Sequence, residues 1–274
     1  MRAGRVGAVT GDGVALTRPR HVRPRLPTLL LAILAAACGS GDRTQAGETA
    51  EAVVVRQPRQ VIVLVDLSAS QAPAMLGEAR AFLDRLISEL WFGDRLVLLE
   101  VHQAGVREAA RRWVDTLPSL PDPSFVTSRD RHRLKGDLDA ARSVSAIFFD
   151  PERARRARHT DLFSTLHVAA EFTRAAGGHQ TVLVVLSDML QSAGNIEMEG
   201  LRRMPPEGWI DAQRAAGLLP RLDGACVMVV GADATTPEGA AVRDFWLRYF
   251  EAAGARLRPE SYRLLAPGGI EGGC

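Results

Sequence analysis

Oxygen-bearing side chains follow an apolar run in the stretch VIVLVDLSAS, residues 61–70. The run is unbroken and rich in β-branched residues, which is typical of a strand buried on both faces of a parallel sheet. It ends at Asp66, and Ser68 and Ser70 follow at alternate positions. One carboxylate and two hydroxyls form an all-oxygen set suited to a hard cation such as Mg²⁺. The same residues also form turns and cap helices, so this stretch alone leaves both interpretations open.

Two further positions supply side chains of the same kind. Thr160 precedes a helical pattern, and Asp188 closes the apolar part of TVLVVLSDML, residues 181–190. In a parallel α/β sheet, the ends of the strands lie at one edge, where ligands bind. The sequence therefore predicts that side chains far apart in the chain converge at this edge.

The order D-x-S-x-S, then a threonine before a helix, then an aspartate closing a later strand, resembles the von Willebrand factor type A (vWA) domain and its metal-ion-dependent adhesion site. The resemblance covers about residues 60–266. It implies that Ser68, Ser70 and Thr160 bind the ion directly, and that Asp66 and Asp188 act directly or through water. It also implies that the ion is Mg²⁺ or Mn²⁺ and that an Asp or Glu of a partner protein completes its coordination. Hydroxyls and carboxylates without thiolate or imidazole favour Mg²⁺ over Zn²⁺.

Two features depart from the family pattern. Met189 stands after the last aspartate, where family members often have glycine, and the stretch between the first two motifs is long. Asp161 has two open interpretations: a bond to the site from outside the ligand set, or a helix-start acid.

Alternating strand and helix patterns surround the motifs. They predict one α/β domain, residues 58–266, with a doubly wound, mostly parallel sheet and helices on both faces; the resemblance implies the Rossmann-like vWA fold. After the first strand, further strands are expected at 95–102, 181–190, 225–233 and 261–266, and helices at 74–90, 160–177, 208–219 and 237–253.

The middle of the chain is less regular. Residues 106–117 fit a short helix or an antiparallel edge strand, and residues 118–124 predict a loop. Residues 125–158 are rich in arginine and alanine and predict a helical insertion, interrupted near Asp150. Acidic neighbours favour a solvated helical face over a nucleic-acid site. Outside the first 25 residues the chain carries 28 basic and 31 acidic side chains, which excludes a basic nucleic-acid binder.

The first 38 residues resemble a bacterial lipoprotein signal. A basic segment, HVRPR, precedes an apolar segment that is shorter than the about 20 residues needed to span a bilayer. Cys38 stands at the position that such signals lipidate, although Ala35 replaces the preferred larger aliphatic residue. A plain secretory signal is the alternative. Residues 39–57 predict a flexible tether, and Gly39 after the cysteine implies an anchor in an outer membrane, facing the periplasm, if the cell has one.

The other cysteines, Cys226 and Cys274, form no zinc pattern and no C-x-x-C motif. Cys226 lies in an apolar run and is expected to be a small buried core residue, in preference to a disulfide partner of Cys274. Residues 267–274 are a glycine-rich tail.

These observations lead to a lipid-anchored cell-envelope module that binds a partner protein through a divalent ion. The alternative is a hydrolase that uses the same ion on a phosphoryl or acyl group. The sequence contains no G-x-S-x-G, Walker or H-E-x-x-H motif, and of its histidines only His159 lies near the candidate site. We therefore assign no catalytic residue. A third interpretation keeps the fold with a purely structural metal.

Overall fold

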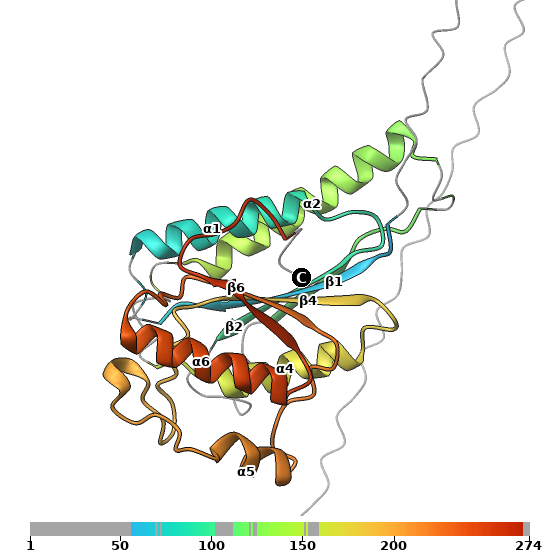
Figure 1. Cartoon of the computed structure of the whole chain (residues 1–274). Helices are drawn as coiled ribbons and strands as arrows, with labels where there is room; N and C mark the ends of the chain where they lie inside the picture. Colours follow the sequence, from blue (N-terminus) through green and yellow to red (C-terminus); the bar gives the residue numbers. More distant parts are fainter. Residues whose placement is uncertain are drawn as a thin grey trace, which may run out of the picture. The chain divides into compact units, whose positions relative to one another are not determined.

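The computed structural model describes residues 56–68, 71, 73–101, 112–120, 122, 125–150, 152 and 159–270. Its centre is a six-stranded sheet in the order β3-β2-β1-β4-β5-β6 (Figure 1). The strands are β1 (Arg59–Asp66), β2 (Arg95–Val101), β3 (Arg112–Thr116), β4 (Gln180–Leu186), β5 (Cys226–Val230) and β6 (Arg256–Arg263). All neighbouring strands are parallel except β2 and β3. The predicted doubly wound, mostly parallel fold is confirmed.

Strand β1 lies inside the sheet, and its sequence explains why. Every residue from Gln60 to Asp66 is buried, because β2 and β4 flank the strand and helices cover both faces. The strand order reverses at β1, with β2 and β3 on one side and β4, β5 and β6 on the other. Open α/β sheets bind ligands at the carboxyl ends of the strands on either side of such a switch point.

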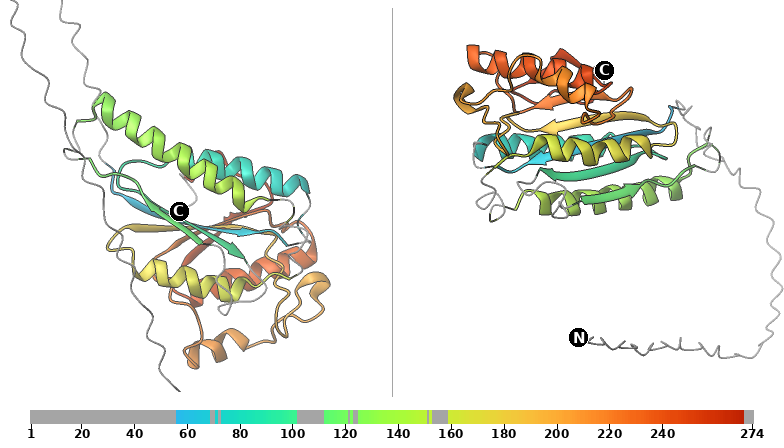
Figure 2. Two further views of the ribbon diagram at one scale, coloured as in Figure 1. Left: turned by 180° about the vertical axis from the view of Figure 1, so that it is seen from behind. Right: turned by 90° about the horizontal axis from the view of Figure 1, so that it is seen from below.

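Two helical layers enclose the sheet (Figure 2). The helices are α1 (Pro73–Ser88), α2 (Ser128–Phe148), α4 (Leu162–Arg174), α5 (Trp209–Ala215) and α6 (Pro237–Ala252), with a 3-10 turn at Glu199–Leu201. Helices α1 and α2 pack in one hydrophobic cluster, and α4 and α6 pack in the cluster on the opposite face. In the predicted insertion, α2 buries Leu134, Ala141 and Phe148. This segment therefore forms part of the core, and its remaining faces are solvated.

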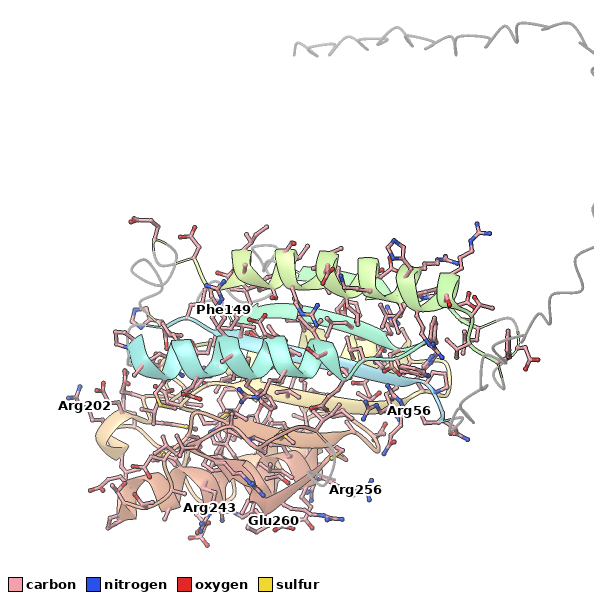
Figure 3. All side chains as sticks on the ribbon, turned by 90° about the horizontal axis from the view of Figure 1, so that it is seen from above. Arg56, Phe149, Arg202, Arg243, Arg256 and Glu260 are labelled. Atoms are coloured by element: carbon pink, nitrogen blue, oxygen red, sulfur yellow. The ribbon has the colours of Figure 1, made fainter. Side chains whose placement is uncertain are left out.

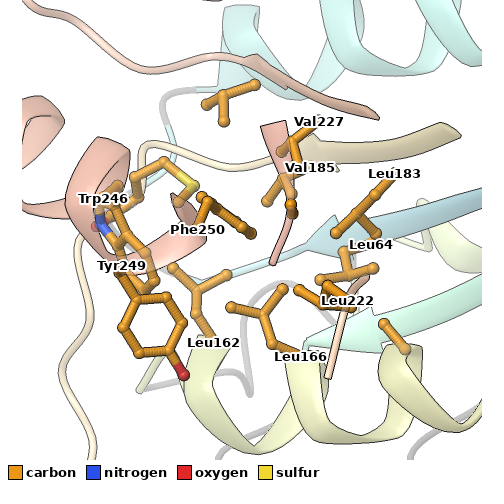
Figure 4. Close-up of a cluster of buried hydrophobic side chains, with 14 of the residues drawn as sticks. Leu64, Leu162, Leu166, Leu183, Val185, Leu222, Val227, Trp246, Tyr249 and Phe250 are labelled. Atoms are coloured by element: carbon orange, nitrogen blue, oxygen red, sulfur yellow. The ribbon is translucent and has the colours of Figure 1, made fainter. Parts of the chain in front are cut away.

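Helix α6 carries a stripe of aromatic side chains that belongs to the core. Trp246, Tyr249 and Phe250 are each 1% exposed or less. Figure 4 shows them on the side of the sheet where Leu162 and Leu166 of α4 also lie. The helix begins after Thr236, whose hydroxyl accepts a hydrogen bond from the backbone N–H of Gly239 at 3.0 Å. This is a regular N-cap, and it fixes the point at which the stripe starts.

Both edge strands differ from a buried strand in composition. Strand β3 is antiparallel, so for residues 112–116 the edge-strand interpretation is correct. Strand β6 covers residues 256–263, whereas the prediction was 261–266. Its start was missed because Pro259 and alternating charges resemble a loop. A sheet edge tolerates proline, and Figure 3 shows Arg256 and Glu260, both exposed, at the outside of the molecule.

Cys226 is 1% exposed and disulfide-bonded. The expectation of an unpaired core cysteine was wrong, because burial does not distinguish a thiol from a disulfide. Cys38 and Cys274, the other two cysteines of the chain, lie outside the described residues. Ile270 is 3% exposed and packs in the cluster under α1, and its N–H donates a hydrogen bond to Glu89 Oε2 at 3.2 Å.

Several predictions fall outside the described residues. Residues 1–55 are among them, so the lipoprotein signal with Cys38 and nearly all of the tether stay predictions. The same holds for Ser70, for residues 102–111 and for residues 153–158. Within the part of the chain that the structure describes, no helix is long and apolar enough to cross a membrane.

Candidate metal centre

Asp66 occupies the carboxyl end of β1 and is 2% exposed. Its Oδ2 accepts a hydrogen bond from Ser187 Oγ at 2.6 Å, and its Oδ1 accepts one from the backbone N–H of Ser68 at 2.9 Å. The register explains the first bond: Val65 pairs with Leu186, so the next residues of β1 and of the chain after β4 lie side by side. The sheet itself therefore brings Asp66 to the loop that carries Asp188.

Two carboxylates lie close together in this buried edge. Burial, and after it the charge of Asp188, raise the pKa of Asp66 to about 6, against the hydrogen bonds from Ser187 and Ser68, which lower it. Among the described residues, no arginine or lysine contributes to this shift. Asp94 offers a contrast: it is also fully buried, but its Oδ2 lies 2.5 Å from Arg56 Nη2.

The other predicted ligands that the structure describes lie at the same edge. Ser68 is 5% exposed and Thr160 is 1% exposed, so both hydroxyl groups belong to the interior. Asp188 is half-buried, and its Oδ1 accepts a hydrogen bond from the N–H of Leu190 at 3.0 Å. The structure thus places these residues with Asp66 at the carboxyl edge; Ser70 lies outside the described residues.

Met189 adopts the backbone conformation that glycine would favour. Its φ angle is 65°, in the left-handed region. Its N–H donates to Ser187 Oγ at 2.9 Å, and its carbonyl oxygen accepts from the indole N–H of Trp246 at 2.9 Å. The departure from the family pattern therefore leaves the turn in place, and hydrogen bonds on both sides hold the strained residue.

Asp161 is the N-cap of α4, so its interpretation as a helix-start acid is supported. Its Oδ1 accepts a hydrogen bond from the N–H of Ser164 at 3.1 Å, and its Oδ2 accepts one from Ser164 Oγ at 2.6 Å. The contact of Asp161 toward the site runs through Gln191, whose Nε2 lies 3.4 Å from Oδ1.

Sequence reasoning missed residues that contact these positions, among them Ser187, Gln191 and Ser192. Ser187 bonds to Asp66, and Gln191, 1% exposed, accepts a hydrogen bond from the N–H of Leu162 through Oε1 at 2.7 Å. The sequence did contain a signal for Ser187, because this polar residue stands between the apolar run of β4 and the candidate ligand Asp188. For Gln191 no local signal exists, since the hydrogen-bond partners of its side chain lie 29 or more residues earlier in the chain.

The donor set fits a hard divalent cation. Burial first, and then the charge of Asp188, raise the pKa of Asp66, and a cation at this edge would offset both effects. Among the described residues, no group of three or more His, Cys, Asp and Glu side chains forms a metal cluster. The candidate site accordingly depends on hydroxyl oxygens beside its two carboxylates, a set that suits Mg²⁺ or Mn²⁺.

The fold and these side chains define a class: a doubly wound α/β domain with oxygen ligands at its switch point. Sheet order and motif placement agree with the vWA-type fold that the sequence resemblance implied. No protein-family model matches the sequence, and no curated protein matches it.

Solved structures resemble the chain at low identity. An aerotolerance-related membrane protein from Bacteroides fragilis is 15% identical, covering 63% of this chain and 67% of its own, with a TM-score of 0.38. Proximal thread matrix protein 1 of the mussel byssus, with zinc in its metal-ion-dependent adhesion site, is 14% identical over 72% of this chain and 48% of its own, with a TM-score of 0.35. A von Willebrand factor type A protein from Catenulispora acidiphila is 12% identical over 72% and 43%, with a TM-score of 0.30. All three are distant likenesses, and the chain spans less than half of the latter two.

Proposed function

We propose that this protein is a vWA-type binding module that holds a divalent cation at the carboxyl edge of β1 and β4. Asp66, Ser68, Ser70, Thr160 and Asp188 are its proposed ligands. The observation that carries the proposal is the pair Asp66 and Asp188: Asp66 is buried at the end of β1, both of its oxygens accept hydrogen bonds, and the charge of Asp188 contributes to its raised pKa. Asp94 shows the contrasting case of a buried carboxylate that forms an ion pair, with Arg56.

The proposed partner is a protein that presents an Asp or Glu side chain. When bound, a Mg²⁺ or Mn²⁺ ion would offset the two carboxylates and offer a coordination position to an oxygen from outside. Asp188 is the half-buried member of the pair and Asp66 the buried one. We therefore expect an external carboxylate to approach on the Asp188 side.

The proposed location is the cell envelope, with a lipid on Cys38. The signal-like first 38 residues support this location, and so does the disulfide at Cys226, because disulfides persist mainly in oxidising compartments outside the cytosol. Mass spectrometry of the membrane-bound protein tests the anchor: a mature chain that begins with a lipidated Cys38 supports it, and an unmodified Cys38 contradicts it.

The metal test is calorimetric titration of the purified protein with Mg²⁺, Mn²⁺ and Zn²⁺. We expect binding of Mg²⁺ or Mn²⁺ that Asp66→Asn abolishes, because this substitution keeps the shape of the side chain and removes its charge. The matched control is Asp233→Asn, an exposed carboxylate after β5 that accepts hydrogen bonds from Thr235. A wild-type protein that binds none of these ions, or an Asp66→Asn variant that binds them as well as wild type, would refute the proposal.

Partner capture tests the binding function separately. The wild-type protein, immobilised with Mg²⁺ or with EDTA, is compared with Asp66→Asn for retained proteins. Metal-dependent capture that is lost in the variant supports a binding module, and capture that ignores both changes contradicts it. A panel of phosphate and ester substrates is run with the same samples; metal-dependent turnover would replace the proposal with a hydrolase.

A further inference from the structure

Hydrogen bonds join the two loops that carry Thr160 and Asp188. We call residues 159–161 the entry loop of α4 and residues 187–192 the exit loop of β4. Thr160 N–H donates to Ser192 Oγ at 2.9 Å, and Ser192 N–H donates to the carbonyl oxygen of Thr160 at 3.0 Å. This is a reciprocal pair, so it fixes both the separation of the loops and their relative orientation.

Gln191 adds a second connection from the buried side. Its Oε1 accepts the N–H of Leu162 at 2.7 Å. Leu162 is the first residue of α4, and its N–H has no partner inside the helix. The N-terminus of α4 is therefore capped twice, by Asp161 from within its own segment and by Gln191 from the exit loop. The backbone carbonyl of Gln191 accepts the N–H of Met198 at 2.9 Å, which holds the glutamine in place.

We propose that Gln191 and Ser192 are positioning residues for the metal centre. Neither is a proposed ligand; together they hold Thr160 at a set distance from Asp188 before the ion arrives. This inference rests on the proposed function. The physical reason is that a ligand held by neighbouring hydrogen bonds loses little freedom on binding, whereas a free loop must be ordered at that moment.

The experiment measures Mn²⁺ affinity by calorimetry for the wild type, Gln191→Leu and Ser192→Ala. Gln191→Leu removes the acceptor of the Leu162 N–H, and Ser192→Ala removes the acceptor of the Thr160 N–H. Partners of metal ligands typically change affinity by about 10- to 100-fold when lost, and we expect weakening within that range. The conservative Ser192→Thr, which keeps the hydroxyl, is expected to restore most of the affinity.

Ser164→Ala is the matched control. It also removes a hydrogen bond at the N-terminus of α4, from Ser164 Oγ to Asp161, but this bond lies within one segment and joins no loops. We expect its Mn²⁺ affinity to stay close to that of the wild type, while its stability in EDTA falls as much as that of Gln191→Leu. Equal loss of affinity in Ser164→Ala and Gln191→Leu would overturn the inference, because general destabilisation would then explain both.

A second readout avoids any variant that fails to fold. In wild-type protein, the amide protons of Thr160 and Leu162 are the ones donated to the exit loop, so we expect both to exchange slowly in EDTA and to change little when the ion binds. Fast exchange of both amides in metal-free protein that slows only on metal binding would overturn the inference and leave the proposed function standing. Absence of any metal binding by the wild type would instead remove the proposed function, and the inference with it.

Discussion

Neutralising Asp66 tests the electrostatic basis of the site most directly. Its pKa is raised from 3.8 to about 6 in the folded protein by burial and by Asp188. Because the folded-state value lies above the unfolded one, the folded protein binds the extra proton between about pH 4 and 6, and the free energy of unfolding falls as pH rises through this window. A shift of about two units corresponds to roughly 3 kcal/mol.

The assay is urea unfolding in EDTA at several pH values from 4 to 7, for the wild type and Asp66→Asn. The difference between the two isolates this group: we expect the wild type to lose roughly 3 kcal/mol relative to the variant between pH 4 and pH 7. For a chain of this size the melting temperature should follow by roughly 6–12 °C. Asp233→Asn should differ little from the wild type over this range, because hydrogen bonds from Thr235 lower the pKa of Asp233 and the stability that this adds is lost only at more acidic pH.

A bound metal ion should offset the loss of unfolding free energy that the wild type shows at pH 7. At pH 7 an ion present at about 100 times its dissociation constant stabilises the folded state by about 2.7 kcal/mol. We expect this gain in wild type and not in Asp66→Asn. Parallel pH profiles for wild type and Asp66→Asn in EDTA would refute the reasoning, because they would mean that Asp66 carries no uncompensated charge in the folded protein.

Further outcomes follow from other contacts. Met189→Gly should be about 1 kcal/mol more stable than Met189→Ala in urea unfolding, the reverse of the usual order, because a φ of 65° strains any residue with a Cβ; the usual order would contradict the strain. Trp246→Phe should cost about 1–3 kcal/mol in the same assay, since the carbonyl of Met189 loses its indole donor; an unchanged stability would show that water replaces the indole. Peptide mapping without reductant should find Cys226 joined to Cys274, because Ile270 packs on the same face of the sheet as Met228; a Cys38–Cys226 peptide would contradict this.

The fold followed from local patterns because its strands are so uniform. Residues 61–65 are all apolar and all fully buried, so composition alone identified a central strand. Prediction from local patterns was less accurate for the half-exposed strand β6. Pro259 is in itself evidence against a strand, but an edge strand has a neighbour on one side only and therefore tolerates proline. The sequence alone does not show that β6 lies at the edge.

In the candidate site, too, local patterns identified some residues, whereas others could be found only from tertiary contacts. Asp66 and Asp188 were accessible from sequence, because each follows an apolar run and strand ends share an edge. Ser187 needed the register that pairs Val65 with Leu186. Gln191 needed the packing of the exit loop against the start of α4, which no periodicity encodes. Candidate ligands can thus be proposed from a sequence, whereas the residues that contact them depend on tertiary structure.

The exit loop of β4 explains how one short segment can serve the whole edge. Ser187 bonds to Asp66, Met189 bonds to Trp246, and Ser192 bonds to Thr160, so β1, α6 and the start of α4 are all tied to it. Because the loop holds two carboxylates near each other, its hydrogen bonds act against electrostatic repulsion that a cation would relieve. The pKa of Asp66 is raised first by burial and then by this repulsion from Asp188. Such local cost at a buried site is expected where a site is organised for a ligand in advance.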